Sequence, residues 1–493
     1  MDGNDIISLF FIDEIGLCEI SPFNPLKVLH SFLELDYKNE KEEIAFVGIS
    51  NWKLDASKMN RGIFLNVFSP ESNVNEMVNT AFEISKIYSK FFIQEDKNKN
   101  LLNHLVRAVY KYKNDLNKNK DINRNFHGTR DFYSLIKTFV NNIIKKQGTN
   151  FDLYNEVFFA IESNYNGLYK NNESSASKAI ESEFIKFNPI EKKKKLNIFS
   201  TIELIKKNIK DNESRYLLLI TKSSLSQYLV KQIIKSEQEE REIVYYLGSL
   251  FEDDIYSEAY SAKAITQIKY YLEEPIILVL KNLSTTYASL YDLFNQRFNY
   301  TLGKKYAEIS MRDVTNPSLV NDALKIIILI DQKALEHQDP PFINRFQKHI
   351  ISFDDLLNKE ELEIANKFYE IMGVFQKTEK TEGIKCNPEY QLINFYPEEI
   401  KGLVFFSKFE NNSQKMEKED YENYIFSKLA KTFSQDIIMF LNVYQSGYKN
   451  LVEKINKYYR KSIHSNLKPN MLYKLLSQFP HLLSKNVLIS LTL

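Results

Sequence analysis

The sequence predicts an α/β protein in which parallel sheets alternate with helical regions. Two short apolar runs, 6–12 and 44–49, flank a stretch of helical spacing at 25–35. Buried strand, helix and buried strand in this order form one βαβ crossover of a parallel sheet. A second series of apolar runs falls at 216–220, 243–247, 276–280 and 325–330. Helical stretches are predicted between these runs, as in a second α/β sheet.

Changes in this pattern divide the chain into five predicted segments. The first, 1–72, holds the first pair of strands and begins in the middle of an α/β unit. Helical spacing over 73–186 predicts a helical lid, and 187–200 is typical of a linker. The second α/β module is predicted over 201–356, followed by a lid or C-terminal helical region over 357–493.

Composition and charge limit the class of protein. The 493 residues are 43% hydrophobic and 26% charged, which is ordinary for a soluble globular protein. The 65 basic and 64 acidic residues nearly cancel, so no global field indicates binding to nucleic acid or to a membrane surface. Cys18 and Cys386 are the two cysteines, which excludes a disulfide framework and fits a reducing compartment. No apolar stretch approaches the roughly 18 residues of a membrane span, and a cytoplasmic location is expected.

The strongest chemical signal is an apolar strand that ends in two carboxylates. The run from Leu9 to Ile12 leads directly into Asp13 and Glu14, at the carboxyl edge of a parallel sheet, where ligands bind in such folds. In nucleoside triphosphate hydrolysis the first carboxylate holds Mg²⁺, and the second accepts a proton from the attacking water or orients it. Alone the pair is a weak signal, because strands often end in Asp or Glu at a solvent-facing turn.

Two later residues strengthen this prediction. Asn51 follows the second strand, where its amide would hydrogen-bond to the attacking water or the γ-phosphate; the alternative is a turn-forming Asn. Arg61 follows ten residues later and would neutralise γ-phosphate charge as an arginine finger; the alternative is a surface ion pair. The whole order, Asp-Glu then Asn then Arg, is far less common by chance than any one member.

These residues resemble the Walker B motif, sensor 1 and arginine finger of AAA+ ATPases. Longer stretches resemble the ATPase core of the mysterin-type giant AAA+ ubiquitin ligases: 11–34, 47–64, 126–137, 282–298 and 340–350. In that family the matched stretches come from two consecutive modules, the third and fourth of a six-module ring. The resemblance implies AAA+ P-loop-type parallel sheets, the first of them truncated, alternating with helical lid subdomains.

Neither module has a complete nucleotide site in this sequence. No Gly-x-x-x-x-Gly-Lys-Ser/Thr occurs, and only 12 residues precede Asp13, so the chain is expected to be a fragment or partial gene model of a larger protein. In the second module the first strand ends at Thr221 without a glycine-rich loop. Lys281 and Asn282 stand where carboxylates belong, and Asp331 stands at the sensor position. This module resembles the inactive modules of the family.

Two further arginines have two interpretations each. Arg130 is predicted to sense nucleotide from the lid; the alternative is a helix-start residue packed on Asp131 or Tyr133. Arg345 has an arginine-finger-like position, and a structural ion pair is equally expected. Ser163 stands where the family has a basic residue, which argues against a second-sensor role there.

The resemblance implies a parent protein that is both an AAA+ ATPase and a ubiquitin-protein transferase, in which ATP binding and hydrolysis control the ligase. ATP and Mg²⁺ are expected only together with the missing Walker A half. Two distant cysteines cannot form a RING-type zinc site, so this chain alone is expected to be inactive. The expected partners are neighbouring AAA+ modules of the parent and, through it, the ubiquitin machinery. The alternative is a non-catalytic scaffold or protein-interaction module with degenerate AAA+ folds.

Overall fold

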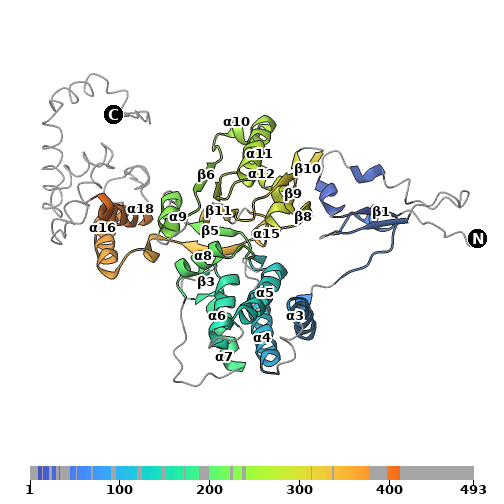
Figure 1. The fold of residues 1–493 in the computed structure, drawn as a ribbon, viewed down its shortest axis with the longest axis horizontal. Coiled ribbons are helices and arrows are strands. Elements are labelled where there is room, and N and C mark those ends of the chain that lie inside the picture. Colours follow the sequence, from blue (N-terminus) through green and yellow to red (C-terminus); the bar gives the residue numbers. More distant parts are fainter. Residues whose placement is uncertain are drawn as a thin grey trace, which may run out of the picture. The chain divides into compact units, whose positions relative to one another are not determined.

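Contacts divide the chain into two compact units, Met1–Ser72 and the much larger Asn73–Leu493, in the computed structural model (Figure 1). The structure describes residues 9–13, 15–20, 25–28, 33, 45–50, 53–67, 70–89, 96–118, 125–146, 152–167, 169–170, 174–187, 199–222, 226–235, 240–311, 314–335, 338–377 and 397–410.

The first unit is built on a pair of parallel strands. β1 (Leu9–Ile12) pairs with β2 (Ala45–Gly48) in parallel, with Ile12 opposite Gly48. The other described elements are short: η1 (Ile15–Ile20), η2 (Pro25–Val28), α2 (Ala56–Met59) and η3 (Pro70–Ser72). The helix predicted at 25–35 is described only as the 3-10 turn η2, and the rest of that helix, apart from position 33, lies outside the described residues.

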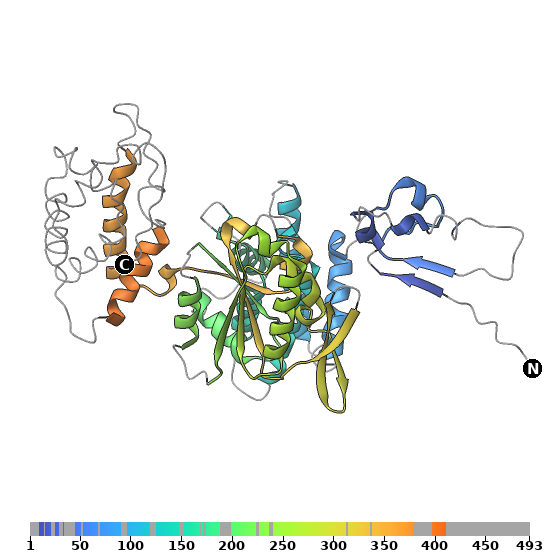
Figure 2. The same ribbon diagram turned by 90° about the horizontal axis from the view of Figure 1, so that it is seen from above.

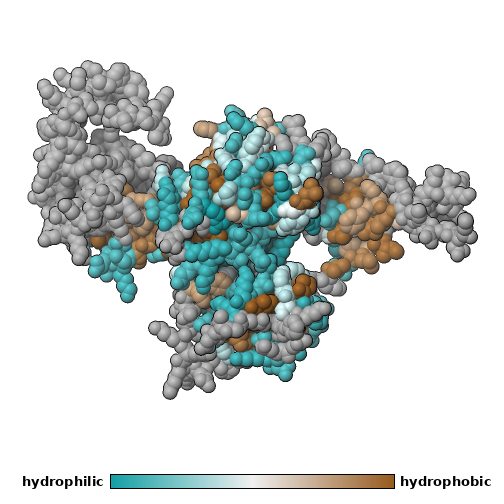
Figure 3. Space-filling model, viewed as in Figure 1, coloured by the Kyte–Doolittle hydropathy of each residue, from teal (hydrophilic) through white to brown (hydrophobic). Residues whose placement is uncertain are grey.

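The prediction that both strands are buried is wrong for this chain. Leu9, Phe10 and Phe11 of β1 are 57%, 50% and 52% exposed, and Figure 3 shows apolar side chains gathered on the surface of this unit. Two strands leave two sheet edges and two faces to cover, and the described part of the unit supplies only short turns for this task. The apolar runs therefore form the predicted strands without the predicted burial.

The second unit begins with a helical subdomain. Its helices are α3 (Val74–Tyr88), α4 (Asp96–Lys118), α5 (Thr129–Lys145), α6 (Leu153–Asn164) and α7 (Ala176–Phe187), with a small hairpin of β3 (Tyr169–Lys170) and β4 (Ser174–Ser175) before α7. Apolar residues at helical spacing on all five helices share one core, which includes Met77, Leu105, Phe139, Ile161 and Phe184. This packing follows from the amphipathic pattern over the segment.

A five-stranded parallel sheet follows the helical subdomain (Figure 2). Its order is β12-β5-β11-β7-β6, made from β5 (Leu217–Thr221), β6 (Ile243–Leu247), β7 (Ile277–Lys281), β11 (Lys325–Asp331) and β12 (Gln347–Ile351). Sheets of this kind are covered on both faces, so their central strands are continuous apolar runs. The four predicted runs at 216–220, 243–247, 276–280 and 325–330 all form strands of this sheet.

Successive residues of the central strands enter two different cores. Ile327 and Leu329 face the core formed with α8 (Thr201–Lys210) and α9 (Ser226–Lys235), whereas Ile326 and Ile328 face the core formed with α11 (Glu258–Leu272). Side chains alternate across a strand, so one apolar run serves both layers. This three-layer arrangement confirms the predicted α/β class.

Helical stretches were expected between all the apolar runs, and this expectation is wrong for 298–319. That segment forms an antiparallel sheet of β8 (Phe298–Thr301), β9 (Lys304–Met311) and β10 (Val314–Leu319). Gly303 has φ +73° at the turn between β8 and β9, a conformation that glycine adopts easily. β12 was likewise absent from the expectation, because its segment begins with the polar residues Gln347, Lys348 and His349.

Short helices complete the α/β module: α10 (Glu252–Ile255), α12 (Ser284–Tyr287), α13 (Tyr291–Phe294), α14 (Gln332–Leu335) and α15 (Pro340–Ile343), with the 3-10 turns η6 (Ala288–Leu290) and η7 (Phe353–Asp355). Of the predicted C-terminal helical region, α16 (Lys359–Lys377) and α18 (Pro397–Glu410) are described. Residues 411–493 lie outside the described part.

Candidate functional site

The strand edge of the first unit carries Asp13. Beyond the paired strands, Ile49 N donates to the carbonyl oxygen of Ile12 at 2.9 Å, and Ile15 N donates to that of Ile49 at 2.9 Å. These two bonds hold the peptide after β2 beside the end of β1, and Asp13 is exposed at this edge. Glu14 and Asn51 lie outside the described residues, so the roles predicted for them remain predictions.

Arg61 follows the single turn of α2. Asp55 caps this turn, accepting hydrogen bonds from Ser57 N at 2.7 Å and Lys58 N at 3.1 Å, as N-cap residues do. Arg61 Nη1 donates to the carbonyl oxygen of Ser57 at 2.6 Å, which places the guanidinium at the carboxyl end of the turn. A cation is favoured there, so this chain holds Arg61 against its own backbone, and the finger role remains a prediction.

The corresponding edge of the second module carries a lysine in place of carboxylates. β7 ends in Lys281, whose ammonium lies 3.1 Å from Ser226 Oγ and 3.3 Å from Asp331 Oδ1. Ser226 opens α9, and Asp331 ends β11, so the three residues come from three elements that meet at the carboxyl edge of the sheet. Lys281 is 9% exposed, and its ammonium is thus largely enclosed by its two partners.

This edge does not fit Mg²⁺. Divalent magnesium requires oxygen ligands with little positive charge beside them, and the Lys281 ammonium occupies the space between the hydroxyl and the carboxylate that would supply them. Asn282 follows with φ 59°, in the left-handed region that Asn tolerates better than most residues. The residue after the neighbouring strand β6 lies close to this edge: Gly248 N donates to the Lys281 carbonyl oxygen at 2.8 Å.

Arg130 and Arg345 meet at one carbonyl group. Arg130, in the first turn of α5, donates from Nη1 to Pro341 O at 3.4 Å. Arg345 also donates to Pro341 O, and its guanidinium carbon lies 3.7 Å from the centroid of the Tyr291 ring. The structure therefore places Arg130 against α15, with the helical subdomain and the α/β module on its two sides. A role for Arg130 at nucleotide remains a prediction.

A buried ion cluster that was not predicted from the sequence joins the helical subdomain to the α/β module. Asp131 of α5 lies 2.7 Å from Lys348 Nζ and 2.9 Å from Arg215 Nη1. The side chains of Asp131 and Lys348 are fully buried. One signal existed in the sequence: Asp131 stands three residues after Gly128, the spacing of a capping box.

Charge compensation controls the titration of this cluster. Burial raises the pKa of Asp131, but Lys348 and Arg215 outweigh burial and hold it below its usual value. Burial lowers the pKa of Lys348 to about 8, against the opposing effect of Asp131. Burial also lowers the pKa of His127 to about 3, so its imidazole is neutral at physiological pH, and Nε2 lies 3.0 Å from the carbonyl oxygen of Asn166. The cluster is a structural joint without a free carboxylate base.

The described residues contain neither a metal-binding cluster nor a membrane-spanning helix. No group of three or more His, Cys, Asp or Glu side chains is arranged to hold a metal ion in the described part of the chain. Within the same residues, no helix combines the length and the apolar character needed to cross a membrane.

Comparisons with known proteins agree on one family. Sequence models of the RNF213 AAA domain match residues 1–74 and 206–357. The E3 ubiquitin-protein ligase RNF213 of Mus musculus is 30% identical over 424 residues, which cover 82% of this chain and 8% of the relative. RNF213 of Homo sapiens is 29% identical over 384 residues, covering 74% of this chain and 7% of the relative.

A third relative gives the same result. The E3 ubiquitin-protein ligase rnf213-beta of Danio rerio is 29% identical over 396 residues, covering 78% of this chain and 7% of the relative. The chain thus spans less than a tenth of the length of these relatives, 8% at most. The matches fall in AAA domains and agree with the parallel sheet and strand edge described above. The chain therefore belongs to the RNF213 family, the mysterin-type AAA+ family that its sequence resembles.

Proposed function

We propose that this chain is part of the AAA+ core of an E3 ubiquitin-protein ligase and couples ATP binding and hydrolysis to control of the ligase. The observation that carries the proposal is the parallel pairing of β1 with β2. This pairing aligns Ile12 with Gly48, so the peptides that lead to Asp13 and to Asn51 leave the sheet at the same edge. Parallel sheets bind their ligands at that edge.

Each residue at the edge has a distinct role in this proposal. Asp13 holds Mg²⁺ once a phosphate-binding loop from elsewhere in the parent completes the site. Glu14 takes a proton from the attacking water or orients it, and Asn51 hydrogen-bonds to that water or to the γ-phosphate. Arg61 neutralises charge on a nucleotide held by an adjacent module.

The second module has a mechanical role rather than a hydrolytic one in this proposal. The contacts of Lys281 with Ser226 and Asp331 support it, because they fill the edge with an internal cation. Asp131 supports it as well, since its pairing with Lys348 makes the lid and the module move together. A nucleotide-dependent shift of the first module would then reach the second through the lid.

The remaining parts of the proposal concern the parent protein. The ligase chemistry lies in other domains, through which this chain meets the ubiquitin machinery, and the protein acts in the cytoplasm. The second candidate function is a non-catalytic scaffold or interaction module. The ammonium of Lys281 at the strand edge favours that candidate for the second module.

The test is Glu14→Gln in the complete protein that carries this segment. Loss of the carboxylate removes the group that accepts a proton or orients water, so ATP turnover is expected to fall roughly 100-fold or more while ATP stays bound. Steady-state phosphate release and retention of labelled ATP measure the two effects. Glu252→Gln, at an exposed position in α10 of the second module, is the matched control and should leave turnover unchanged. Equal turnover in the Glu14→Gln variant and the wild type would contradict the proposal.

A further inference from the structure

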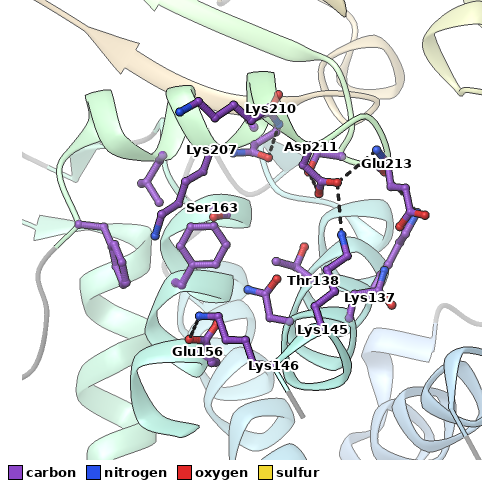
Figure 4. A pocket seen from close by; sticks show the side chains of 18 of the residues that line it. Lys137, Thr138, Lys145, Lys146, Glu156, Ser163, Lys207, Lys210, Asp211 and Glu213 are labelled. Atoms are coloured by element: carbon purple, nitrogen blue, oxygen red, sulfur yellow. Dashed lines mark hydrogen bonds and ion pairs between the residues drawn. The ribbon is translucent and has the colours of Figure 1, made fainter. Parts of the chain in front are cut away.

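A cavity of about 680 Å³ lies where the helical subdomain meets the α/β module. Helices α5 and α6 form one wall, and α8 with the turn that follows it forms the other (Figure 4). Its volume is within the range of small-molecule sites. The turn after α8 precedes β5, and Gln347, the first residue of β12, also lines the cavity. The cavity is therefore at the amino edge of the sheet, opposite the edge where Lys281 lies.

Lysines outnumber acidic residues by one in the cavity wall. Four acidic residues oppose them, namely Asp152, Glu156, Asp211 and Glu213, whereas the lysines are Lys137, Lys145, Lys146, Lys207 and Lys210. Two of the lysines form ion pairs. Lys145 Nζ lies 3.4 Å from Asp211 Oδ1 on the opposite wall, and Lys146 pairs with Glu156 of α6. The cavity thus keeps a surplus of positive charge.

Lys207 is the lysine of the cavity wall that lies against two aromatic rings. Its ammonium lies 4.5 Å from the centroid of the Phe159 ring and 4.4 Å from that of Phe199, and no carboxylate within the described residues forms an ion pair with it. Burial lowers the pKa of Lys207 and the charge of Lys146 lowers it further, against the opposing effects of Glu156 and Glu203. Two aromatic faces hold this ammonium at a fixed place in the wall. An anion bound there would relieve the repulsion between the two lysines.

The floor of the cavity holds polar groups without partners. Ser163 is 3% exposed, and its hydroxyl has no hydrogen-bond partner among the described residues. Asn208, also 3% exposed, donates from Nδ2 to Arg215 O at 3.0 Å and to Gln347 Oε1 at 2.6 Å, while its Oδ1 lacks a partner within the same residues. Buried polar groups are normally satisfied, and an exception indicates an absent water or ligand.

We propose that this cavity binds a small phosphorylated polyol, with the phosphate against Lys207 and Lys146 and the hydroxyl groups toward the amide and hydroxyl side chains of the walls and floor. The neighbouring ammonium groups of Lys207 and Lys146 select the anion, and the phosphate supplies several acceptor oxygens to these donors. The walls supply hydrogen-bonding groups for the polyol: Thr138, Asn141, Asn142, Asn155 and Ser163. Lys207 lies over the rings of Phe159 and Phe199, the two aromatic side chains that line the cavity within the described residues, so the faces that it covers are closed to a nucleobase.

Binding would also hold the helical subdomain and the α/β module in a fixed arrangement. α5 and α6 belong to the helical subdomain and α8 to the α/β module, so a ligand that contacts both walls ties them together. Any molecule that binds only the folded arrangement of these two parts raises the stability of the folded protein by mass action. The site is independent of the nucleotide edge, so this inference does not rest on the proposed function.

The test is titration of the 493-residue chain with inositol 1,4,5-trisphosphate, ribose 5-phosphate, inorganic phosphate and unphosphorylated inositol, followed by calorimetry and thermal unfolding. We expect the phosphorylated polyols to bind and raise Tm, with at least 10-fold weaker binding for inorganic phosphate and none for inositol. Lys207→Ala should weaken binding at least 10-fold, Lys207→Arg should retain it, and Ser163→Ala should weaken it without lowering the Tm of the free protein. Lys263→Ala, at an exposed lysine of α11 outside the cavity, is the matched control.

Three results would overturn the proposal: no binding of either phosphorylated polyol at millimolar concentration, equal affinity for inorganic phosphate and the polyol phosphates, or unchanged affinity in a folded Lys207→Ala variant. Binding of adenosine monophosphate more tightly than ribose 5-phosphate would also overturn it, because the ring faces that Lys207 covers are closed to the base.

Discussion

At the scale of single residues, the substitutions at one strand edge determine what the second module can do. Lys281 brings a positive charge to the position where a carboxylate would hold Mg²⁺, and it satisfies that charge internally with Asp331 at 3.3 Å. The neighbouring Asn282 is a neutral side chain held in a left-handed conformation, φ 59°. A neutral amide accepts no proton from water at physiological pH. Two adjacent residues thus remove both functions of the acidic pair.

Asp131 is the residue whose replacement should most affect stability. Its fully buried carboxylate compensates Lys348 and Arg215, and Asp131→Asn would leave the buried Lys348 and the partly buried Arg215 without that charge. Removing one partner of a buried ion pair destabilises a protein by about 3–5 kcal/mol. Chemical denaturation should therefore show this loss, whereas Asp253→Asn, at an exposed position in α10, should change stability by less than about 0.5 kcal/mol. A loss below about 1 kcal/mol for Asp131→Asn would show that the cluster is dispensable.

At the scale of elements, the ends of β6 and β7 approach so closely that only glycine fits between them. A Cβ added to Gly248 would lie 1.9 Å from the carbonyl oxygen of Asn282. This contact is with backbone rather than with a flexible side chain, so the strands must separate to relieve it. The geometry that places Lys281 at the edge depends on this approach, because Gly248 N donates to its carbonyl oxygen at 2.8 Å.

Gly248→Ala is expected to destabilise the α/β module by at least about 2 kcal/mol, because overpacking against backbone forces strand displacement. Thermal unfolding measures the effect. Gly62→Ala is the matched control, since nothing lies within 4 Å of the position where its Cβ would be, and it should shift stability by less than about 0.5 kcal/mol. Equal stability of the two variants would mean that β6 can move away from β7 without loss.

At the scale of the whole molecule, two kinds of α/β unit occur in one chain. The first has the acidic strand end but few described elements around it, and the second has a complete five-stranded sheet but a lysine at its edge. The nucleotide sites of the two units are incomplete for different reasons. One is a site that lacks its phosphate-binding half within this sequence, and the other is a site whose chemistry is altered within a complete fold.

The 493-residue chain is therefore expected to bind Mg²⁺-ATP weakly or not at all, because no glycine-rich loop offers backbone N–H groups to the phosphates. Titration calorimetry with Mg²⁺-ATP should show no saturation up to millimolar nucleotide. Lys281→Met should leave that result unchanged, since removal of the ammonium restores no ligand for Mg²⁺. Micromolar binding by the wild-type chain would contradict the assignment of both nucleotide sites as incomplete.

The fold was largely predictable, because its signals are local and strong. Apolar runs of five or six residues, at 216–220, 243–247, 276–280 and 325–330, predicted four strands of the parallel sheet, and helical spacing predicted the lid. The antiparallel sheet at 298–319 was missed because its strands contain few apolar residues and β10 contains Pro317, which is unfavourable in most strands. β12 was missed because it begins with Gln347, Lys348 and His349, and three consecutive polar residues do not indicate a buried strand.

The candidate site was predictable only in part. Asp13 stands at the edge where the strand pattern predicts it, and Lys281 ends its strand as expected. The contacts of Lys281 with Ser226 and Asp331 join residues up to 105 positions apart, from 226 to 331. No local pattern specifies which of several polar residues a lysine will meet across a sheet edge.

The sequence by itself determined the family, the parallel sheet, the acidic strand end of the first unit and the loss of that pair in the second, because these depend on residue identity and on order along the chain. Only the tertiary structure decided that Asp131 pairs with Lys348 and Arg215, that Lys281 is neutralised inside the module, and that five lysines surround one cavity between lid and module. The physical reason is that burial and the partners of a charge are fixed by contacts between distant segments. Those contacts form only when the helical subdomain and the sheet close on one another.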